Sequence, residues 1–201
     1  MTRTTKEFDL ISVPFRQETV RIAKTTEAEL VSFYPEMNDA FSNRLAPLKI
    51  CERIRRCNPD NMWTIHAAQS RTTIGLYANI ILSISGRKAL LEGKFRANAP
   101  SAIHTATQGD PVGAIYTWAV LAPGRAALAI PLVAEQFKTP KYVNIDIYGN
   151  GMTDAGKRIM EALGFQCIQS TQDSFLYMYQ RLANRKYRLK SPNSKKEYDN
   201  V

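Results

Sequence analysis

Apolar and polar positions alternate near the start of the chain with the period of a strand and then change to the period of a helix. Residues 18–25 read as a strand, and residues 25–41 follow with helical spacing. Thr25 or Thr26 can serve as the N-cap, and Glu29 lies three positions after Thr26, where it can complete a capping box. The first elements are therefore expected to be a strand that leads directly into a helix.

The following segments predict a second helix and then two strands. Residues 47–57 are expected to form a helix because apolar side chains recur on one face: Leu48, Cys51 and Ile54. Residues 62–69 and 72–85 are rich in branched and aromatic side chains, which favour adjacent strands joined by a polar turn. A short helix over 85–95 and a polar connection over 96–111 complete the first half.

The second half alternates strands and helices more regularly. Residues 112–122 predict a buried strand, 125–137 a helix and 153–165 another helix. Residues 167–182 contain one or two further strands. Residues 141–149 predict a strand with three apolar side chains on one face: Val143, Ile145 and Ile147. This β-α-β-α-β order indicates an α/β fold in which right-handed crossover helices cover a sheet.

The composition fits one globular domain without a membrane span. The 201 residues are 44% hydrophobic and 22% charged, which is ordinary for a folded domain. The apolar run 74–84 is interrupted by Asn79 and Ser83, and it falls short of the roughly 20 apolar residues that cross a bilayer. The N-terminus lacks the apolar core of a signal peptide, so a cytoplasmic location is expected. The three cysteines are expected to be reduced structural thiols: Cys51, Cys57 and Cys167.

The net charge of +9 is concentrated at the C-terminal end. Residues 181–201 carry seven Lys or Arg against Glu197 and Asp199, and we interpret them as a basic tail that follows the domain. Such a tail can attract nucleic acid, an acidic protein or an anionic surface, or it can simply be a solvated terminus. A basic fold also suits an anionic cofactor.

Residues 120–165 carry a family resemblance. Their sequence, VLAPGRAALAIPLVAEQFKTPKYVNIDIYGNGMTDAGKRIMEALGF, resembles the C-terminal half of the GNAT (general N-acetyltransferase) superfamily, in which a strand leads into a Q/R-x-x-G-x-G/A loop. Gly124 and Ala126 match the glycine positions of that loop, and Gly164 matches the Leu-Gly-Phe turn after the next helix. The resemblance implies a GNAT-like acyl-CoA N-acyltransferase fold over residues 1–180, with a mixed, twisted central sheet flanked by helices.

The resemblance also implies acetyl-CoA or another acyl-CoA as the acyl donor. In this family the diphosphate binds where the helix after the loop begins, because the first amides of a helix lack intrahelical partners and the dipole favours negative charge there. The pantetheine arm pairs with the exposed backbone of the preceding strand. The residues placed in these roles are Trp118, Ala119 and Val120 for the arm, and Gly124, Arg125, Ala126 and Ala127 for the diphosphate.

Three positions depart from the family pattern. Leu121 stands where the loop usually begins with Gln or Arg, and Pro131 falls inside the expected helix, where an interior proline costs about 3 kcal/mol. A helix that begins later would relieve this cost and move the diphosphate site toward Ala129 and Ile130. Met160 stands where many members have a tyrosine that protonates the departing thiolate, and a thioether cannot donate a proton.

Two side chains are candidates for proton transfer. Tyr148 lies at the end of the strand beside the cofactor path and is a substitute acid, although an aromatic at this position more often packs. Asp146 is a candidate base that faces away from Ile145 and Ile147, toward either the cofactor or solvent. Other titratable side chains have no motif behind them: His66, His104, Asp110 and Glu135. The sequence contains neither the G-x-S-x-G motif of hydrolases nor a P-loop.

Two functions therefore stay open. One is an acyltransferase that moves an acetyl or other acyl group from coenzyme A directly to an amine on a small molecule or a protein. The other is a catalytically silent GNAT-like protein whose basic tail contacts nucleic acid or an acidic partner, and Leu121, Pro131 and Met160 favour it. A homodimer is compatible with both.

Overall fold

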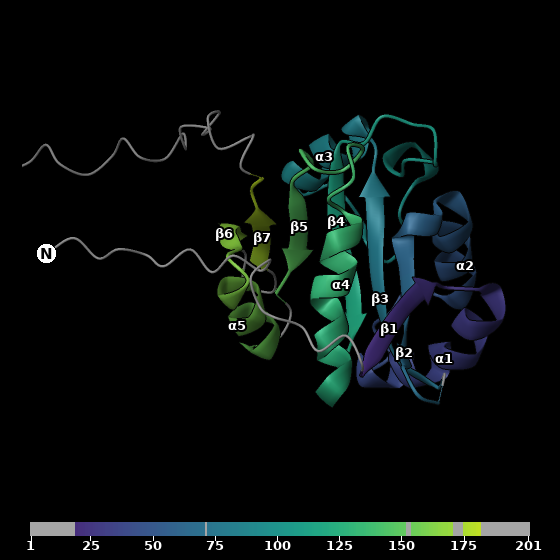
Figure 1. Ribbon diagram of the computed structural model, residues 1–201. Helices are drawn as coiled ribbons and strands as arrows, with labels where there is room; N and C mark the ends of the chain where they lie inside the picture. Colours follow the sequence, from purple (N-terminus) through teal and green to yellow (C-terminus); the bar gives the residue numbers. More distant parts are fainter. Residues whose placement is uncertain (1–18, 71, 152–153, 171–174, 182–201) are drawn as a thin grey trace, which may run out of the picture.

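The central feature of the protein is one mixed sheet (Figure 1). The computed structural model describes residues 19–70, 72–151, 154–170 and 175–181. Their strands pair in the order β1-β2-β3-β4-β5-β7-β6, with β4 and β5 parallel and all other neighbours antiparallel. The strands are β1 (Val20–Lys24), β2 (Met62–Ala67), β3 (Thr73–Leu82), β4 (Ala114–Leu121), β5 (Ile147–Asn150), β6 (Gln166–Ser170) and β7 (Phe175–Tyr179).

Helices cover both faces of this sheet. The α-helices are α1 (Glu27–Ala40), α2 (Leu48–Cys57), α3 (Ile84–Leu91), α4 (Ala129–Gln136) and α5 (Asp154–Ala162). Short 3-10 segments are η1 (Pro59–Asn61), η2 (Ala102–His104) and η3 (Gly124–Leu128). Helices α1, α2 and α3 pack on the face that carries Leu76 and Tyr148, whereas α4 packs on the face that carries Ile81 and Ile115. Met160 of α5 contacts Gly149 on this second face, so α4 and α5 lie on the same side. None of the helices in the described residues is long and apolar enough to cross a membrane.

The predicted start of the first helix is confirmed. The Thr26 backbone N–H donates to Glu29 Oε2 at 2.8 Å, and the Glu29 backbone N–H donates to Thr26 Oγ1 at 3.2 Å. Together these bonds form the capping box at the N-terminus of α1 and satisfy two amides that the helix itself leaves unpaired. A short sequence pattern therefore determines where α1 begins.

The predicted turn after α5 is also confirmed. Gly164 has a φ of +83°, and the Phe165 N–H donates to Met160 O at 2.9 Å while the Gly164 N–H donates to Glu161 O at 3.0 Å. This pair of bonds is the Schellman arrangement, which needs a left-handed residue after the helix and favours glycine there. The Phe165 ring then packs against Tyr179 of β7, with 5.5 Å between ring centroids.

The strand predicted for 141–149 begins later than expected. Residues before Ile147 form turns, in which the N–H groups of Tyr142 and Val143 both donate to Thr139 O at 2.9 Å. Val143 is consequently 41% exposed rather than on the buried face of a strand. The alternation of Val143 and Ile145 was wrong as a strand signal, because local turn bonds occupy the backbone groups that a strand would need.

We expect a large difference in reactivity between the buried and the exposed cysteine. Burial raises the pKa of Cys51 to about 12, whereas the Cys167 side chain is exposed. Since the thiolate is the reactive form, Cys51 should react with a chromogenic disulfide reagent only after unfolding, and Cys167 should react in the folded state. Absorbance measured with and without denaturant distinguishes the two in a Cys57→Ser background, which removes the half-buried third thiol, with and without Cys167→Ser. Fast modification of Cys51 in the native protein would contradict this prediction.

Candidate functional site

The two parallel strands separate partway along β4. Pairing between β4 and β5 covers Ile115–Ile147, Tyr116–Tyr148 and Thr117–Gly149. Strand β4 continues to Leu121 and remains paired with β3 over this distance. Along the described residues, the backbone of β4 after Thr117 therefore has no partner in β5.

A bulge in β4 lies at the same level. Ala78 of β3 is opposite Ala119, and the next residue, Asn79, is opposite Thr117, so Trp118 is the extra residue in β4. Bulges bend a strand and increase its twist, which accounts for the direction in which β4 leaves β5. The predicted arm-binding residues thus lie on the separated part of β4, where Ala119 is buried and Trp118 and Val120 are half-buried.

The loop after β4 leads into a helical segment in two parts. Gly124 has a φ of +54° and starts η3, and α4 begins only at Ala129. Pro131 is consequently the third residue of α4, where a missing N–H removes no interior helix bond. The later helix start that the proline suggested is what the structure has. Such a start would move the diphosphate toward Ala129 and Ile130, but Ala129 is fully buried, so the accessible backbone at this place is that of η3 at Gly124 and Arg125.

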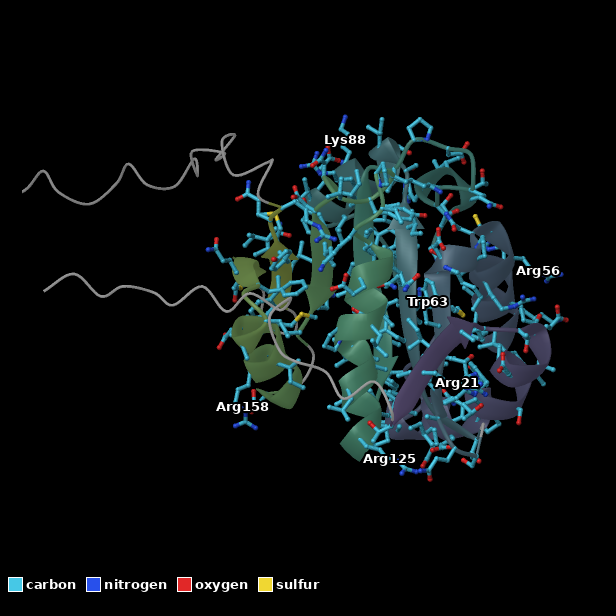
Figure 2. The ribbon with its side chains drawn as sticks, viewed as in Figure 1. Arg21, Arg56, Trp63, Lys88, Arg125 and Arg158 are labelled. Carbon is cyan, nitrogen blue, oxygen red and sulfur yellow. The ribbon has the colours of Figure 1, made fainter. Side chains whose placement is uncertain are left out.

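The four predicted diphosphate residues differ in their exposure. Gly124, Arg125 and Ala127 are exposed, and a Cβ added at Gly124 would meet no atom within 4 Å. The Ala126 side chain is buried against Val20, and its N–H donates to Pro123 O at 3.0 Å. Figure 2 shows Arg125 at the end of the molecule where β4 finishes, with Lys88 at the opposite end. Three of the four positions are therefore accessible to an anion.

Tyr148 is fully buried on the sheet face covered by α1, α2 and α3. Its hydroxyl accepts a hydrogen bond from Arg87 Nε at 3.4 Å. Burial raises the pKa of Tyr148, and the bond and charge of Arg87 oppose that shift in part. The hydroxyl therefore points to α3, on the face opposite α4 and α5.

Asp146 is buried rather than in solvent, immediately before β5. Its Oδ1 accepts from the Arg181 backbone N–H at 2.9 Å, and Arg87 Nη2 lies 3.9 Å from its Oδ2. The Arg181 side chain donates to Ile145 O and to Phe137 O, each at 3.2 Å. Asp146 thus joins the start of β5 to the end of β7 and to α3.

The remaining titratable candidates are not brought together. His66 lies 3.3 Å from Glu29, Asp110 accepts from Thr107, and Glu135 pairs with Lys138. His104 lies against Phe95, with 6.3 Å between ring centroids. Within the described part of the chain, no group of three or more His, Cys, Asp or Glu side chains could hold a metal ion.

Comparison with known proteins identifies the architecture. No family model matches the sequence, and no curated protein matches it. Among solved structures, Arabidopsis thaliana NAA60 in complex with acetyl-CoA matches with a TM-score of 0.53 at 14% identity, over 81% of this chain and 99% of that chain. The same protein in complex with a bisubstrate analogue matches with a TM-score of 0.51 at 13% identity, over 82% and 99%. The chain has the GNAT fold. At these identities the likeness is one of fold, and it confirms the architecture that residues 120–165 predicted.

Within this GNAT fold, Met160 lies at the separation of the two strands. A Cβ on Gly149 would collide with the Met160 terminal methyl and would lie 3.6 Å from Thr117 Cβ. Met160 therefore covers the last paired residues of β4 and β5 from the side of α5. Met160, where the resemblance led us to expect a tyrosine, thus lies beside Thr117 and Gly149, the last pair before the strands separate.

Sequence analysis missed two cavities of this GNAT fold. One, of about 640 Å³, lies beside α3 and the starts of β4 and β5, and is lined by Arg87, Lys88, Glu92 and Asp146 among others. The other, of about 70 Å³, lies between the sheet and α4 and includes Asn79. Their walls come from segments far apart in the chain, so no local pattern could have indicated them.

Proposed function

We propose that this protein transfers an acyl group, acetyl or another, from its coenzyme A thioester to an amine acceptor. The observation that carries this proposal is the separation of β4 from β5 after Thr117, next to a helical segment that starts at the exposed Gly124. Free strand backbone beside a helix start can bind an amide-containing arm that ends in a diphosphate. The fold shared with a protein bound to acetyl-CoA supports the same proposal.

The loop residues fit the anionic end of the donor. Gly124 has open space around its Cα, so phosphate oxygens can approach the backbone N–H groups there. Arg125 is exposed at the same place and can add a charge-assisted hydrogen bond. The exposed Ala127 keeps the wall of the site low, whereas the Ala126 N–H is already bonded to Pro123 O.

The chemistry follows from the separated strand. The arm would lie along Trp118, Ala119 and Val120, and a backbone N–H, which we assign to Val120, would donate to the thioester oxygen. The amine nitrogen attacks the thioester carbon, and the tetrahedral intermediate collapses with cleavage of the carbon–sulfur bond. The amine proton leaves to a base or to water, and the thiolate takes up a proton. Tyr148 stays the candidate acid and Asp146 the candidate base. The acceptor is an amine-bearing small molecule or a protein, and a homodimer stays a prediction.

Two observations favour the alternative of a catalytically silent binding protein. Met160 offers no proton at the separated strands, and the Tyr148 hydroxyl is buried on the other face of the sheet. The basic tail at 181–201 and residues 1–18 lie outside the described residues, apart from Arg181. Contact of the tail with nucleic acid or an acidic partner, and a cytoplasmic location, stay predictions.

Acetyl-CoA binding to wild type and to Arg125→Glu tests the proposed site. We expect the charge reversal to weaken binding about tenfold or more, because it removes a phosphate partner and adds repulsion. Titration calorimetry gives both affinities directly. Arg56→Glu is the matched control, since Arg56 is exposed on α2, across the sheet from α4, and its reversal should leave affinity unchanged. Absence of binding to wild type at millimolar acetyl-CoA would overturn the proposed function.

A further inference from the structure

Asn79 is a buried polar side chain without a partner. It lies in the middle of β3 and is 0% exposed. Neither its Oδ1 nor its Nδ2 has a hydrogen-bond partner among the residues that the structure describes. Buried carboxamides are nearly always hydrogen-bonded. A donor or acceptor that is buried without a partner loses its hydrogen bonds to water and gains none in the protein, which costs free energy of folding. Asn79 therefore calls for an explanation.

Its position relates it to the separated strands. Asn79 is opposite Thr117, the last residue of β4 that pairs with β5. The hydroxyl groups of Tyr77 and Thr117 do not bond to Asn79, and they lie 3.3 Å from each other in a hydrogen bond. The unsatisfied carboxamide thus lies at the level where β4 and β5 part.

Asn79 also lines the cavity of about 70 Å³ under α4. The walls around it are mostly hydrocarbon, from Ile115, Ile147, Ala134 and Phe137. Two cationic side chains at the cavity already have partners. Lys138 forms an ion pair with Glu135, and Arg181 donates hydrogen bonds to the carbonyl oxygens of Ile145 and Phe137. Asn79 thus offers a neutral donor and a neutral acceptor, side by side, to a ligand in this cavity.

We propose that the Asn79 carboxamide binds the pantetheine arm of the acyl-CoA donor. This inference rests on the proposed function. A ligand for this place must be slender and apolar, and must offer an N–H, a C=O or both, because a phosphate or a sugar would bring unsatisfied groups into the hydrocarbon walls. The arm carries two amides, a hydroxyl and a thioester on an aliphatic chain, so one of its amides with the adjacent methylenes meets each requirement in a cavity of this size. Asn79 is then a binding and positioning residue whose free polar groups reduce the stability of the unliganded fold.

This proposal predicts opposite effects of one substitution on stability and on binding. Asn79→Leu keeps the size of the side chain and removes both unsatisfied groups, so the urea midpoint should rise. The same change should weaken acetyl-CoA binding about tenfold, which is about 1.4 kcal/mol. The nucleotide half of coenzyme A, which lacks the arm, should bind wild type and variant equally. Asn79→Ala is the second variant and should show the same loss of acetyl-CoA affinity.

Asn61→Leu is the matched control. Asn61 is also fully buried, but its Nδ2 donates to Ile54 O and its Oδ1 accepts from the Ile81 N–H, each at 2.8 Å. Its replacement should lower the urea midpoint and leave acetyl-CoA affinity unchanged. If Asn79→Leu behaves like Asn61→Leu, buried water satisfies Asn79 and the inference is overturned. It is likewise overturned if wild type binds acetyl-CoA and both Asn79 variants bind it equally well. Failure of wild type to bind would instead reject the proposed function, and this inference with it.

Discussion

Replacement of Met160 by tyrosine is expected to raise the rate of acyl transfer by about 100-fold, the lower end of what a positioned general acid contributes. Met160 lies against Gly149, beside the last paired residues of β4 and β5, where the proposed thioester sulfur would arrive. A thioether cannot protonate the departing thiolate, whereas a phenol at this position can. The measurement is the initial rate of thiol release from acetyl-CoA in the presence of a panel of amines, at saturating donor.

Two further variants make this result specific. Met160→Phe supplies the ring without the hydroxyl and should give no gain. Tyr148→Phe should leave the rate unchanged if the buried hydroxyl serves only Arg87. If instead Met160→Tyr gives no gain and Tyr148→Phe lowers the rate about 100-fold, Tyr148 is the acid. If no variant turns over but wild type binds acetyl-CoA, the chain is a silent binding protein.

Much of the fold was predictable because its signals are local. The capping box of Thr26 and Glu29 and the glycine turn at Gly164 each depend on residues within one or two helical turns. Pro131 likewise restricted where α4 could begin, and α4 begins two residues before it. Such features follow from backbone geometry, so the sequence alone carries them.

The predictions that failed have two causes: local turn bonds that compete with a strand, and contacts between segments far apart in the sequence. The segment before Ile147 has strand-like alternation, but turn bonds to Thr139 and bonds from Arg181 occupy its backbone. The candidate site depends in the same way on register. Asn79 became a candidate only because the β3–β4 bulge places it opposite Thr117. The contact of Arg87 with Tyr148 likewise depends on where α3 packs. Family resemblance could indicate which strand is expected to bind the arm, but not which side chains the neighbouring strands bring to it.

Replacement of Asp146 by alanine is expected to reduce the free energy of unfolding by about 2–3 kcal/mol, because the buried carboxylate is a charged hydrogen-bond acceptor for the Arg181 N–H. The carboxylate accepts from the Arg181 backbone N–H and lies 3.9 Å from Arg87 Nη2. Without it, the half-buried Arg181 N–H loses its acceptor, and the Arg87 and Arg181 guanidinium groups lose a nearby negative charge between α3, β5 and β7. Urea unfolding monitored by circular dichroism measures the change.

Asp146→Asn separates a structural role from a catalytic one. The amide keeps an acceptor for the Arg181 N–H and loses only the charge, so we expect a smaller loss, about 1–2 kcal/mol. Asp154→Asn is the surface control: the Asp154 side chain is 88% exposed beside Lys157, and its change should cost less than about 0.5 kcal/mol. A base would show the reverse pattern, in which Asp146→Asn abolishes transfer and barely changes stability. This carboxylate is buried and lies where three elements meet. We therefore expect its loss to change the free energy of unfolding rather than the rate of acyl transfer.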